Sequence, residues 1–265
     1  MVTRLSCIEF GRELIQTNDL DPVYVILWNA NLTPKKLERW LLAYWCFYHM
    51  GTASWIAHSG KGYWNRFQKA AGSKEYPRCS ERRHYRGQQA INSTTYLQSR
   101  GVPSLFEPLR TGGTCGEVMK EVQNWVGFGP WISFKVADML ERLDLAPISF
   151  STEDVYLFES PKIGAEKLRE SLELSENDPE LNGRVESWAV EYILGKIGDL
   201  EAPPQFEREI GPQEAETVLC KWKSYLNGRY TIGEDIESCH KCLNKFSSCG
   251  TSTELLKAGE RAKLW

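Results

Sequence analysis

The sequence predicts an all-α protein, and three observations support that class. Apolar residues recur at helical spacing along most of the chain. Proline or a capping residue stands where several of these stretches begin. No convincing set of alternating apolar and polar segments suggests a sheet. With 265 residues, of which 42% are hydrophobic, the chain has the length of one large domain or of two packed helical lobes.

The first half of the chain divides into helical segments at its prolines and glycines. Thr33 is a candidate N-cap, because proline follows it at the first helical position. The helix that begins there, over residues 34–51, is expected to be buried. An aromatic-rich segment covers residues 55–67, and a further helix is expected over 77–98. Two prolines mark residues 103–108 as a loop.

A helix, a glycine hairpin and a second helix are predicted at about residues 115–143. Thr114 and Glu117 fit a capping box, so the first helix begins there. Gly127-Phe128-Gly129 breaks it, because glycine permits the positive φ of a tight turn. Pro130 then starts the second helix.

The remaining chain is expected to be helical as well, with a linker at residues 200–204, where two prolines stand together. This linker divides a catalytic region, residues 1–200, from a C-terminal segment, residues 201–265, that holds a helix and a cysteine cluster. The helices expected after the hairpin cover residues 164–174, 182–196 and 212–226.

The charge of the chain excludes one class of nucleic-acid-binding protein. A net charge of −3 does not suit a protein that coats nucleic acid by bulk positive charge, so any DNA contact needs a local basic surface. Ten Trp and eleven Tyr would suit stacking on bases. Neither a signal peptide nor a transmembrane segment is expected, which points to the cytoplasm and to no membrane partner.

The glycine hairpin is a candidate phosphate site. A turn of this kind directs backbone N–H groups outward beside a helix N-terminus, and these groups bind phosphate without a basic side chain. An acidic protein can hold DNA in this way, although such turns also occur as plain structural elements. The residues assigned to DNA binding are Gly127, Gly129, Pro130, Trp131 and Lys135.

The segment after the hairpin resembles the helix–hairpin–helix DNA glycosylases. In that superfamily an aspartate follows the hairpin helix and opens a helix that faces the flipped base; by this match Asp154 is its counterpart. The hairpin-to-aspartate distance is a few residues longer than usual, and Trp131 stands near the place of the lyase lysine. A strand-cleaving lyase is therefore not expected. Asp154 could equally cap a helix, and the two roles are compatible.

The N-terminal part of the chain carries a closer resemblance. Three short blocks, Asp21-Pro22-Val23-Tyr24, Leu27-Trp28-Asn29-Ala30 and Arg39-Trp40, precede the run Tyr44-Trp45-Cys46-Phe47-Tyr48-His49-Met50-Gly51-Thr52-Ala53-Ser54-Trp55. With the hairpin and the C-terminal cysteines, this pattern resembles the phage amino acid:DNA transferases, also described as α-glutamyl/putrescinyl thymine pyrophosphorylases. The resemblance covers roughly residues 20–160 and the C-terminal end.

The resemblance implies a reaction on DNA. Phages of this kind carry 5-hydroxymethyluracil, which a kinase converts to its pyrophosphate ester, and the transferase displaces pyrophosphate with an amine such as glycine, glutamate or putrescine. The implied partners are double-stranded DNA containing this activated base and a small amine or amino acid, in the cytoplasm of the infected host. No nucleotide cofactor is expected.

This chemistry requires cationic or N–H partners for pyrophosphate, a base for the amine, and an aromatic pocket for a flipped nucleotide. For pyrophosphate, the candidates are Arg78, Arg82, Arg83 and Arg86, because spacing of four residues places three of them on one helix face. The alternative is a solvated face paired with nearby glutamates.

The base and the aromatic pocket have candidates in the same regions. Asp154 is preferred as the group that accepts the amine proton, and His49 is the second candidate, although a histidine among aromatics also suits a core position. The candidates for stacking on the base, with ordinary core packing as the alternative, are Trp28, Tyr44, Trp45 and Trp131.

The C-terminal cysteines form a candidate metal site. Cys239 and Cys242 make a C-x2-C pair, Cys249 follows, and Cys220 precedes them. Such clustering in a chain without an export signal favours a metal over disulfides. A [4Fe–4S] cluster like that of some helix–hairpin–helix glycosylases is expected, with zinc or reduced thiols as alternatives. No transfer chemistry is assigned to it.

Three functions from different classes follow from these observations. The leading one is an amine transferase acting on modified DNA. The alternatives are a DNA glycosylase that releases a modified or damaged base, and a non-catalytic helix–hairpin–helix DNA-binding protein. The N-terminal aromatic block favours the transferase, because the resemblance to glycosylases does not account for it.

Overall fold

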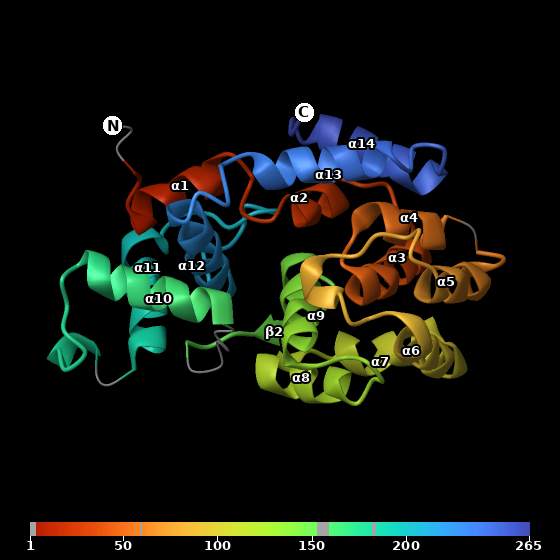
Figure 1. The fold of residues 1–265 in the computed structure, drawn as a ribbon, viewed down its shortest axis with the longest axis horizontal. Helices are drawn as coiled ribbons and strands as arrows, with labels where there is room; N and C mark the ends of the chain where they lie inside the picture. The colour runs from red at the N-terminus through yellow and green to blue at the C-terminus, as the bar shows by residue number, and fades with distance from the viewer. Residues whose placement is uncertain (1–3, 59, 153–158, 182–183) are drawn as a thin grey trace. The chain divides into compact units, whose positions relative to one another are not determined.

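The structure, a computed structural model, describes residues 4–58, 60–152, 159–181 and 184–265. The chain folds into two compact units, each made of two separate stretches: unit 1 holds Met1–Pro22 and Phe150–Ile236, and unit 2 holds Val23–Ser149 and Glu237–Trp265. The all-α class is confirmed, because helices dominate and the described residues contain only two strands of two residues each (Figure 1). The division does not fall at the expected 200–204 linker, where Ala202 is instead fully buried.

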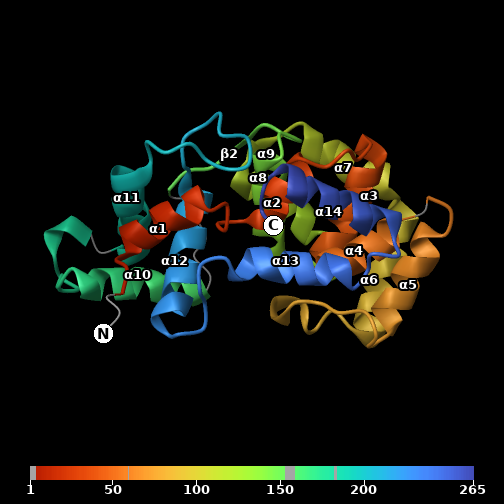
Figure 2. The ribbon, with the colours of Figure 1, turned by 90° about the horizontal axis from the view of Figure 1, so that it is seen from above.

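Unit 2 contains the aromatic block and the glycine hairpin. Its helix α14 lies alongside α4 and the end of α2, where the Arg261 guanidinium donates to the Asn29 carbonyl (Figure 2). The helices and strands with residues in unit 2 are α2 (Pro22–Trp28), α3 (Pro34–Phe47), α4 (Met50–Ala57), α5 (Tyr63–Gly72), the 3-10 helix η1 (Ser80–Arg82), α6 (Gly87–Arg100), α7 (Val102–Arg110), β1 (Gly113–Thr114), α8 (Cys115–Gln123), α9 (Pro130–Arg142), β2 (Ile148–Ser149), α13 (Glu234–Asn244, from Glu237 onward) and α14 (Gly250–Arg261).

Unit 1 is a helical unit with its own apolar core. Gly164 on α10 lies against α12, where an added Cβ would stand 2.3 Å from the Leu219 carbonyl oxygen, so the two helices require glycine at their crossing. Asp19 is fully buried and accepts from the backbone N–H groups of Gly233 and Ile236 at 2.7 and 3.0 Å. Its helices are α1 (Cys7–Gln16), α10 (Glu159–Ser171), the 3-10 helix η2 (Pro179–Leu181), α11 (Val185–Ile197) and α12 (Pro212–Leu226).

Two of the expected element boundaries were wrong for identifiable reasons. The helix expected over 77–98 is interrupted, because α6 begins only at Gly87, whose φ is +56°. Closely spaced arginines also disfavour a continuous helix there. The expected loop at 103–108 is helix α7. Pro103 stands in its first turn and loses no hydrogen bond, and Pro108 is accommodated inside the helix near its end.

The strands β1 and β2 pair in parallel and tie the start of α8 to the chain that follows α9. Gly112 precedes β1 with φ +70°, and an added Cβ would stand 2.1 Å from the Pro147 carbonyl oxygen. The capping box at the start of α8 is confirmed, with Thr114 and Glu117 each accepting from the other's backbone N–H. The strand pair and the capping box together fix the start of α8 beside the segment that follows α9.

None of the described helices combines the length and the apolar composition needed to cross a bilayer.

Candidate functional site

The glycine hairpin joins α8 to α9 as the sequence predicts. Gly127 has φ +88°, a conformation that favours glycine, whereas Gly129 is the extended N-cap of α9 and needs no glycine for its backbone. Gly129 and Pro130 are exposed, and the first N–H groups of any helix lack partners within it. The hairpin therefore presents the N-terminus of α9 to solvent, as a phosphate site requires.

Arg82 links this hairpin to the end of α3 and does not project into solvent. Its side chain donates to the Cys46 carbonyl at 3.0 Å and to the Gly127 carbonyl at 3.1 Å. The guanidinium lies 5.4 Å from the centre of the Phe128 ring, and the residue is only 7% exposed. These two hydrogen bonds give Arg82 a structural role. Its Nη2 is buried and has no hydrogen-bond partner among the described residues, so its part in binding pyrophosphate stays a prediction.

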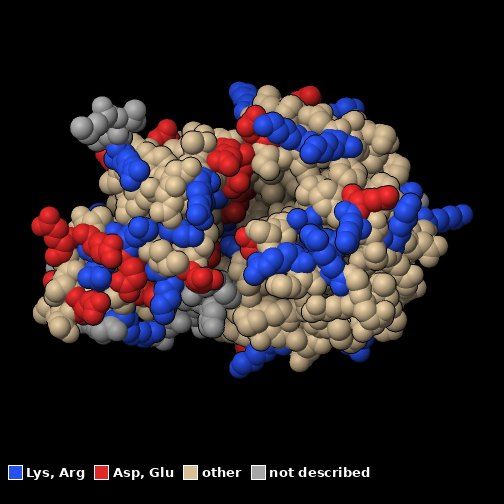
Figure 3. Space-filling model, in the orientation of Figure 1, with Lys and Arg blue, Asp and Glu red and all other residues tan. Residues whose placement is uncertain are grey.

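The other three candidate arginines for pyrophosphate binding do not form one group either. Arg78 donates to the carbonyls of Ala70 and Ser73, at 3.2 and 3.0 Å, and so closes the end of α5. Arg83 and Arg86 are exposed. Figure 3 shows Lys and Arg side chains gathered on the face of unit 2 that carries this segment. Since Arg82 bonds the same segment to the hairpin, the exposed arginines stand near the hairpin and suit a DNA backbone.

An aromatic row runs along α3 and ends at the hairpin helix. Trp40 stacks on Tyr44 with ring centres 4.8 Å apart, and Tyr44 lies 4.6 Å from Tyr48. Tyr48 meets Trp131 edge to face at 5.0 Å. The row passes from fully buried Trp40 to partly exposed Tyr48 and Trp131, so its outer end offers rings to a base.

Tyr48 owes its position to an uncommon backbone. It ends α3 with φ +47° and ψ +45°, a left-handed conformation that bulky residues rarely adopt. Such strain costs about 1–3 kcal/mol and clusters at functional sites. The conformation ends the expected helix at Phe47, four residues before Gly51, and turns the Tyr48 ring onto Trp131.

Helix α9 carries a polar face inside an otherwise apolar helix. Trp131, Lys135, Asp138 and Arg142 recur at intervals of four, three and four residues, which places them on one face. Asp138 and Arg142 are fully buried, and the Tyr24 hydroxyl donates to Asp138 at 2.7 Å. Lys135 Nζ lies 4.0 Å from the same carboxylate. Buried charged clusters of this kind are frequent at functional sites.

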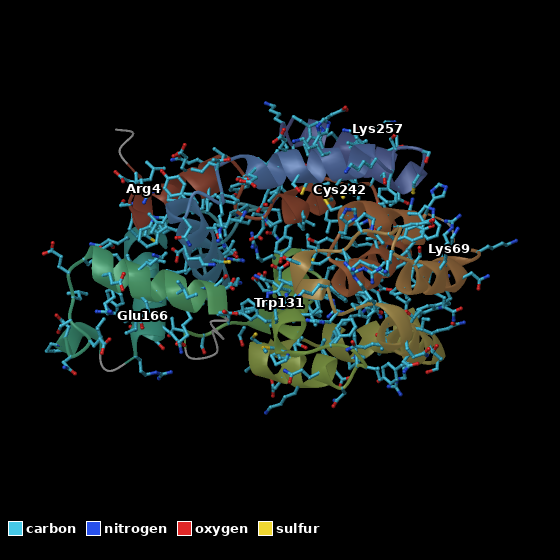
Figure 4. The ribbon with its side chains drawn as sticks, viewed as in Figure 1. Arg4, Lys69, Trp131, Glu166, Cys242 and Lys257 are labelled. Carbon is cyan, nitrogen blue, oxygen red and sulfur yellow. The ribbon has the colours of Figure 1, made fainter. Side chains whose placement is uncertain are left out.

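Lys135 was expected at the DNA surface, and the structure places it elsewhere. The residue is 8% exposed, because its side chain lies along α9 toward Asp138. Trp131, one helical turn earlier, is partly exposed at the start of the helix and is labelled in Figure 4. The hairpin backbone and the exposed arginines are therefore better placed than Lys135 to contact DNA at the surface.

Three further predicted residues fall in different places. Trp45 is fully buried, stacks on Phe106 at 5.3 Å and donates to the Met139 sulfur, so it cannot stack on a base. Trp28 is 43% exposed at the end of α2. Asp154 lies outside the described residues.

His49 is the N-cap of α4, and its environment opposes protonation. Its Nδ1 accepts from the Thr52 N–H at 3.1 Å, and Nε2 lies 3.3 Å from the Cys242 sulfur. Burial, and secondarily the charge of Lys245, lower the pKa of His49 from 6.5 to about 4. A neutral imidazole that caps a helix has a structural role, which leaves it a weak proton acceptor.

His49→Asn is expected to reduce the amount by which the free energy of unfolding falls in mild acid. The unfolded chain binds a proton near pH 6.5 that folded His49 refuses until about pH 4, so stability is full above pH 6.5 and falls between these values. The wild type should lose on the order of 2–3 kcal/mol more than the variant over this range. Asparagine is a good N-cap without a proton to bind. Urea unfolding at pH 7 and pH 4.5 measures the difference; parallel losses in both proteins would contradict the assignment.

Two of the candidate metal ligands lie on one helix. Cys239 and Cys242 lie on helix α13, which holds their backbone in regular helical form. Cys242 accepts from the Gly51 N–H at 3.1 Å, and the Cys249 thiol donates to the Ser54 carbonyl at 3.1 Å. In the part of the chain that the structure describes, no three His, Cys, Asp or Glu side chains are grouped as metal ligands. A metal held by Cys220, Cys239, Cys242 and Cys249 stays a prediction, and we derive no chemistry from one.

Comparison with known proteins identifies the family. A model of the amino acid:DNA transferases matches residues 12–230. The chain belongs to this family. It is 36% identical over 257 residues to a glycinyltransferase of Pseudomonas phage PaMx11, with 88% of each chain covered. It is also 24% identical over 260 residues to a putrescinyltransferase of Delftia phage PhiW-14, with 95% of this chain and 81% of the relative covered.

In this amino acid:DNA transferase, unit 2 holds the hairpin, the aromatic row and the charged face of α9. The resemblance seen in the sequence is confirmed by the family match. Sequence reasoning missed Tyr48, Tyr24, Asp138 and Arg142, although the spacing of charged residues after Trp131 was a readable signal. The apolar residues of α9 predict a buried helix, but they do not predict that charged side chains are buried with them.

Proposed function

We propose that this transferase displaces pyrophosphate from 5-pyrophosphoryloxymethyluracil in phage DNA with an amine, in the cytoplasm of the infected host. The amine is an amino acid or a polyamine, as the names of the two relatives suggest. The single observation that carries the placement of the site is the aromatic row, which ends at Trp131 where the exposed hairpin begins α9.

The hairpin and the exposed arginines support a DNA contact beside this row. The N-terminus of α9 binds a phosphate through backbone N–H groups, and Arg83 and Arg86 contribute positive charge next to it. A nucleotide that leaves the duplex at this point reaches the rings of Tyr48 and Trp131. The acidic chain therefore holds DNA through a local surface.

Mass spectrometry tests the reaction directly. DNA carrying 5-pyrophosphoryloxymethyluracil is incubated with the protein and a pool of amino acids and polyamines, then digested to nucleosides. A new nucleoside whose base has gained one amine and lost pyrophosphate supports the transfer and identifies the donor. Unchanged nucleosides would sink the proposal for those amines, and free base with abasic sites would indicate a glycosylase.

Trp131→Ala is expected to weaken binding of DNA that contains the modified base. Loss of one stacked base costs about 1–3 kcal/mol, which corresponds to roughly a 5- to 150-fold rise in the dissociation constant. Fluorescence anisotropy with modified and unmodified duplexes measures this effect. Trp64→Ala, on the partly buried first turn of α5, is the matched control. Equal affinities of wild type and Trp131→Ala for the modified duplex would contradict the role of the aromatic row in binding the base.

A further inference from the structure

The departing pyrophosphate needs a cationic partner, and the four candidate arginines are engaged elsewhere or exposed. Arg78 donates to backbone carbonyls at the end of α5. Arg82 donates to two backbone carbonyls, and its remaining Nη2 is buried without a hydrogen-bond partner among the described residues. Arg83 and Arg86 are exposed on the segment before α6 and suit the DNA backbone. Further candidate cations lie on the face of α9 that begins with Trp131.

Two cations lie on that face, and only one of them has an exposed part. Arg142 is fully buried, and its guanidinium stacks over the Tyr24 ring at 4.4 Å, three turns from the start of the helix. Lys135 lies one turn after Trp131, and its side chain keeps 10% of its surface exposed. Four residues of helix rise by about 6 Å, so Lys135 is the nearer of these two cations to a base at Trp131.

Lys135 is also held in place before any substrate arrives. Its Nζ lies 4.0 Å from Asp138 Oδ2, the oxygen that accepts from the Tyr24 hydroxyl. Arg142 approaches the other oxygen, Oδ1, at 3.9 Å. Asp138 is fully buried and so acts as a positioning residue. A fixed cation in a poorly solvated place stabilises developing negative charge far better than a mobile surface lysine.

From this arrangement we propose that Lys135 is a catalytic residue, whose ammonium group contacts the pyrophosphate as it leaves. This assignment rests on the proposed amine transfer. The amine nitrogen attacks the methylene carbon on C5 of the base, the carbon–oxygen bond breaks, and its electron pair goes to pyrophosphate. The amine proton goes to a separate base. Lys135 remains protonated throughout and offsets the charge that collects on the leaving oxygen.

The first test is the transfer reaction with variants at this position. Lys135→Gln is expected to lower kcat/KM for transfer about 10²- to 10³-fold. Lys135→Arg, which keeps the positive charge, is expected to recover at least tenfold over the glutamine variant. Lys257→Gln, an exposed change on α14 with the same loss of charge, is the control and should leave the rate unchanged. A Lys135→Gln rate within threefold of wild type would overturn the assignment.

The second test needs no transfer activity and so separates the two proposals. Inorganic pyrophosphate is titrated calorimetrically into wild type, Lys135→Gln and Lys257→Gln, each checked for a native circular dichroism spectrum. We expect Lys135→Gln alone to raise the dissociation constant at least tenfold. Equal affinities would overturn the role of Lys135 even if the wild type transfers amines. Weaker binding by Lys135→Gln together with an inactive wild type would uphold the pyrophosphate contact and contradict the proposed transfer.

Discussion

Asp154→Asn is expected to lower the rate of amine transfer about 10²- to 10⁴-fold while DNA binding stays unchanged. The amine must lose a proton to attack carbon, and an amide cannot accept that proton. His49 offers little substitute, because burial holds its pKa at about 4 and its Nδ1 already accepts from the Thr52 N–H. Single-turnover transfer with saturating amine measures the effect.

The control for this substitution is Asp144→Asn. Asp144 is exposed after the end of α9 and has φ +52°, a conformation that asparagine adopts readily. The Asp144→Asn substitution removes the same charge and leaves the aromatic row unchanged. Wild-type transfer by Asp154→Asn would remove the aspartate from the mechanism, whereas a loss that recovers as the pH rises would agree with its role as the proton acceptor.

Arg142→Met is expected to destabilise the protein by about 3–5 kcal/mol. The substitution leaves Asp138 buried without one of its two cationic neighbours, and the loss of a partner from a buried pair costs far more than the pair itself contributes. It also removes the stacking of the guanidinium on Tyr24. Urea unfolding followed by tryptophan fluorescence measures the free energy change.

Arg110→Met is the matched control for this prediction. Arg110 forms ion pairs with Glu38 and Glu107, but its side chain is 48% exposed, so its loss should cost less than about 1 kcal/mol. The double variant Asp138→Asn with Arg142→Met should be less destabilised than the sum of its single changes, because the two residues interact. Additive changes, or an Arg142→Met cost equal to that of Arg110→Met, would contradict the buried network.

Local sequence signals predicted the parts of the site that depend on neighbouring residues. The capping box at Thr114 and the proline at the start of α9 both appear where the sequence placed them. The positive φ of Gly127 was likewise readable. These features rest on the conformational limits of glycine and proline and on side chains that bond to a backbone three residues away.

The arginines illustrate what such signals leave open. Spacing alone placed Arg78 and Arg82 on one helix face. In the structure, Arg78 bonds to carbonyls near the end of α5 and Arg82 to the Cys46 carbonyl near the end of α3. A guanidinium group has several donors, and a folded chain uses them wherever backbone carbonyls lack partners. Which carbonyls are available depends on the ends of α3 and α5, and no local pattern reports that.

By itself, the sequence determined the helical class, the hairpin and the family of this protein, because each depends on short patterns of residue type. Only the tertiary structure decided that Lys135, Asp138 and Arg142 lie inward together and that Tyr48 turns onto Trp131. The periodicity of a helix tells which residues share a face but not what that face meets. Because most of α9 is buried, contacts such as the hydrogen bond from Tyr24 on α2 decide which of its faces holds the charged residues.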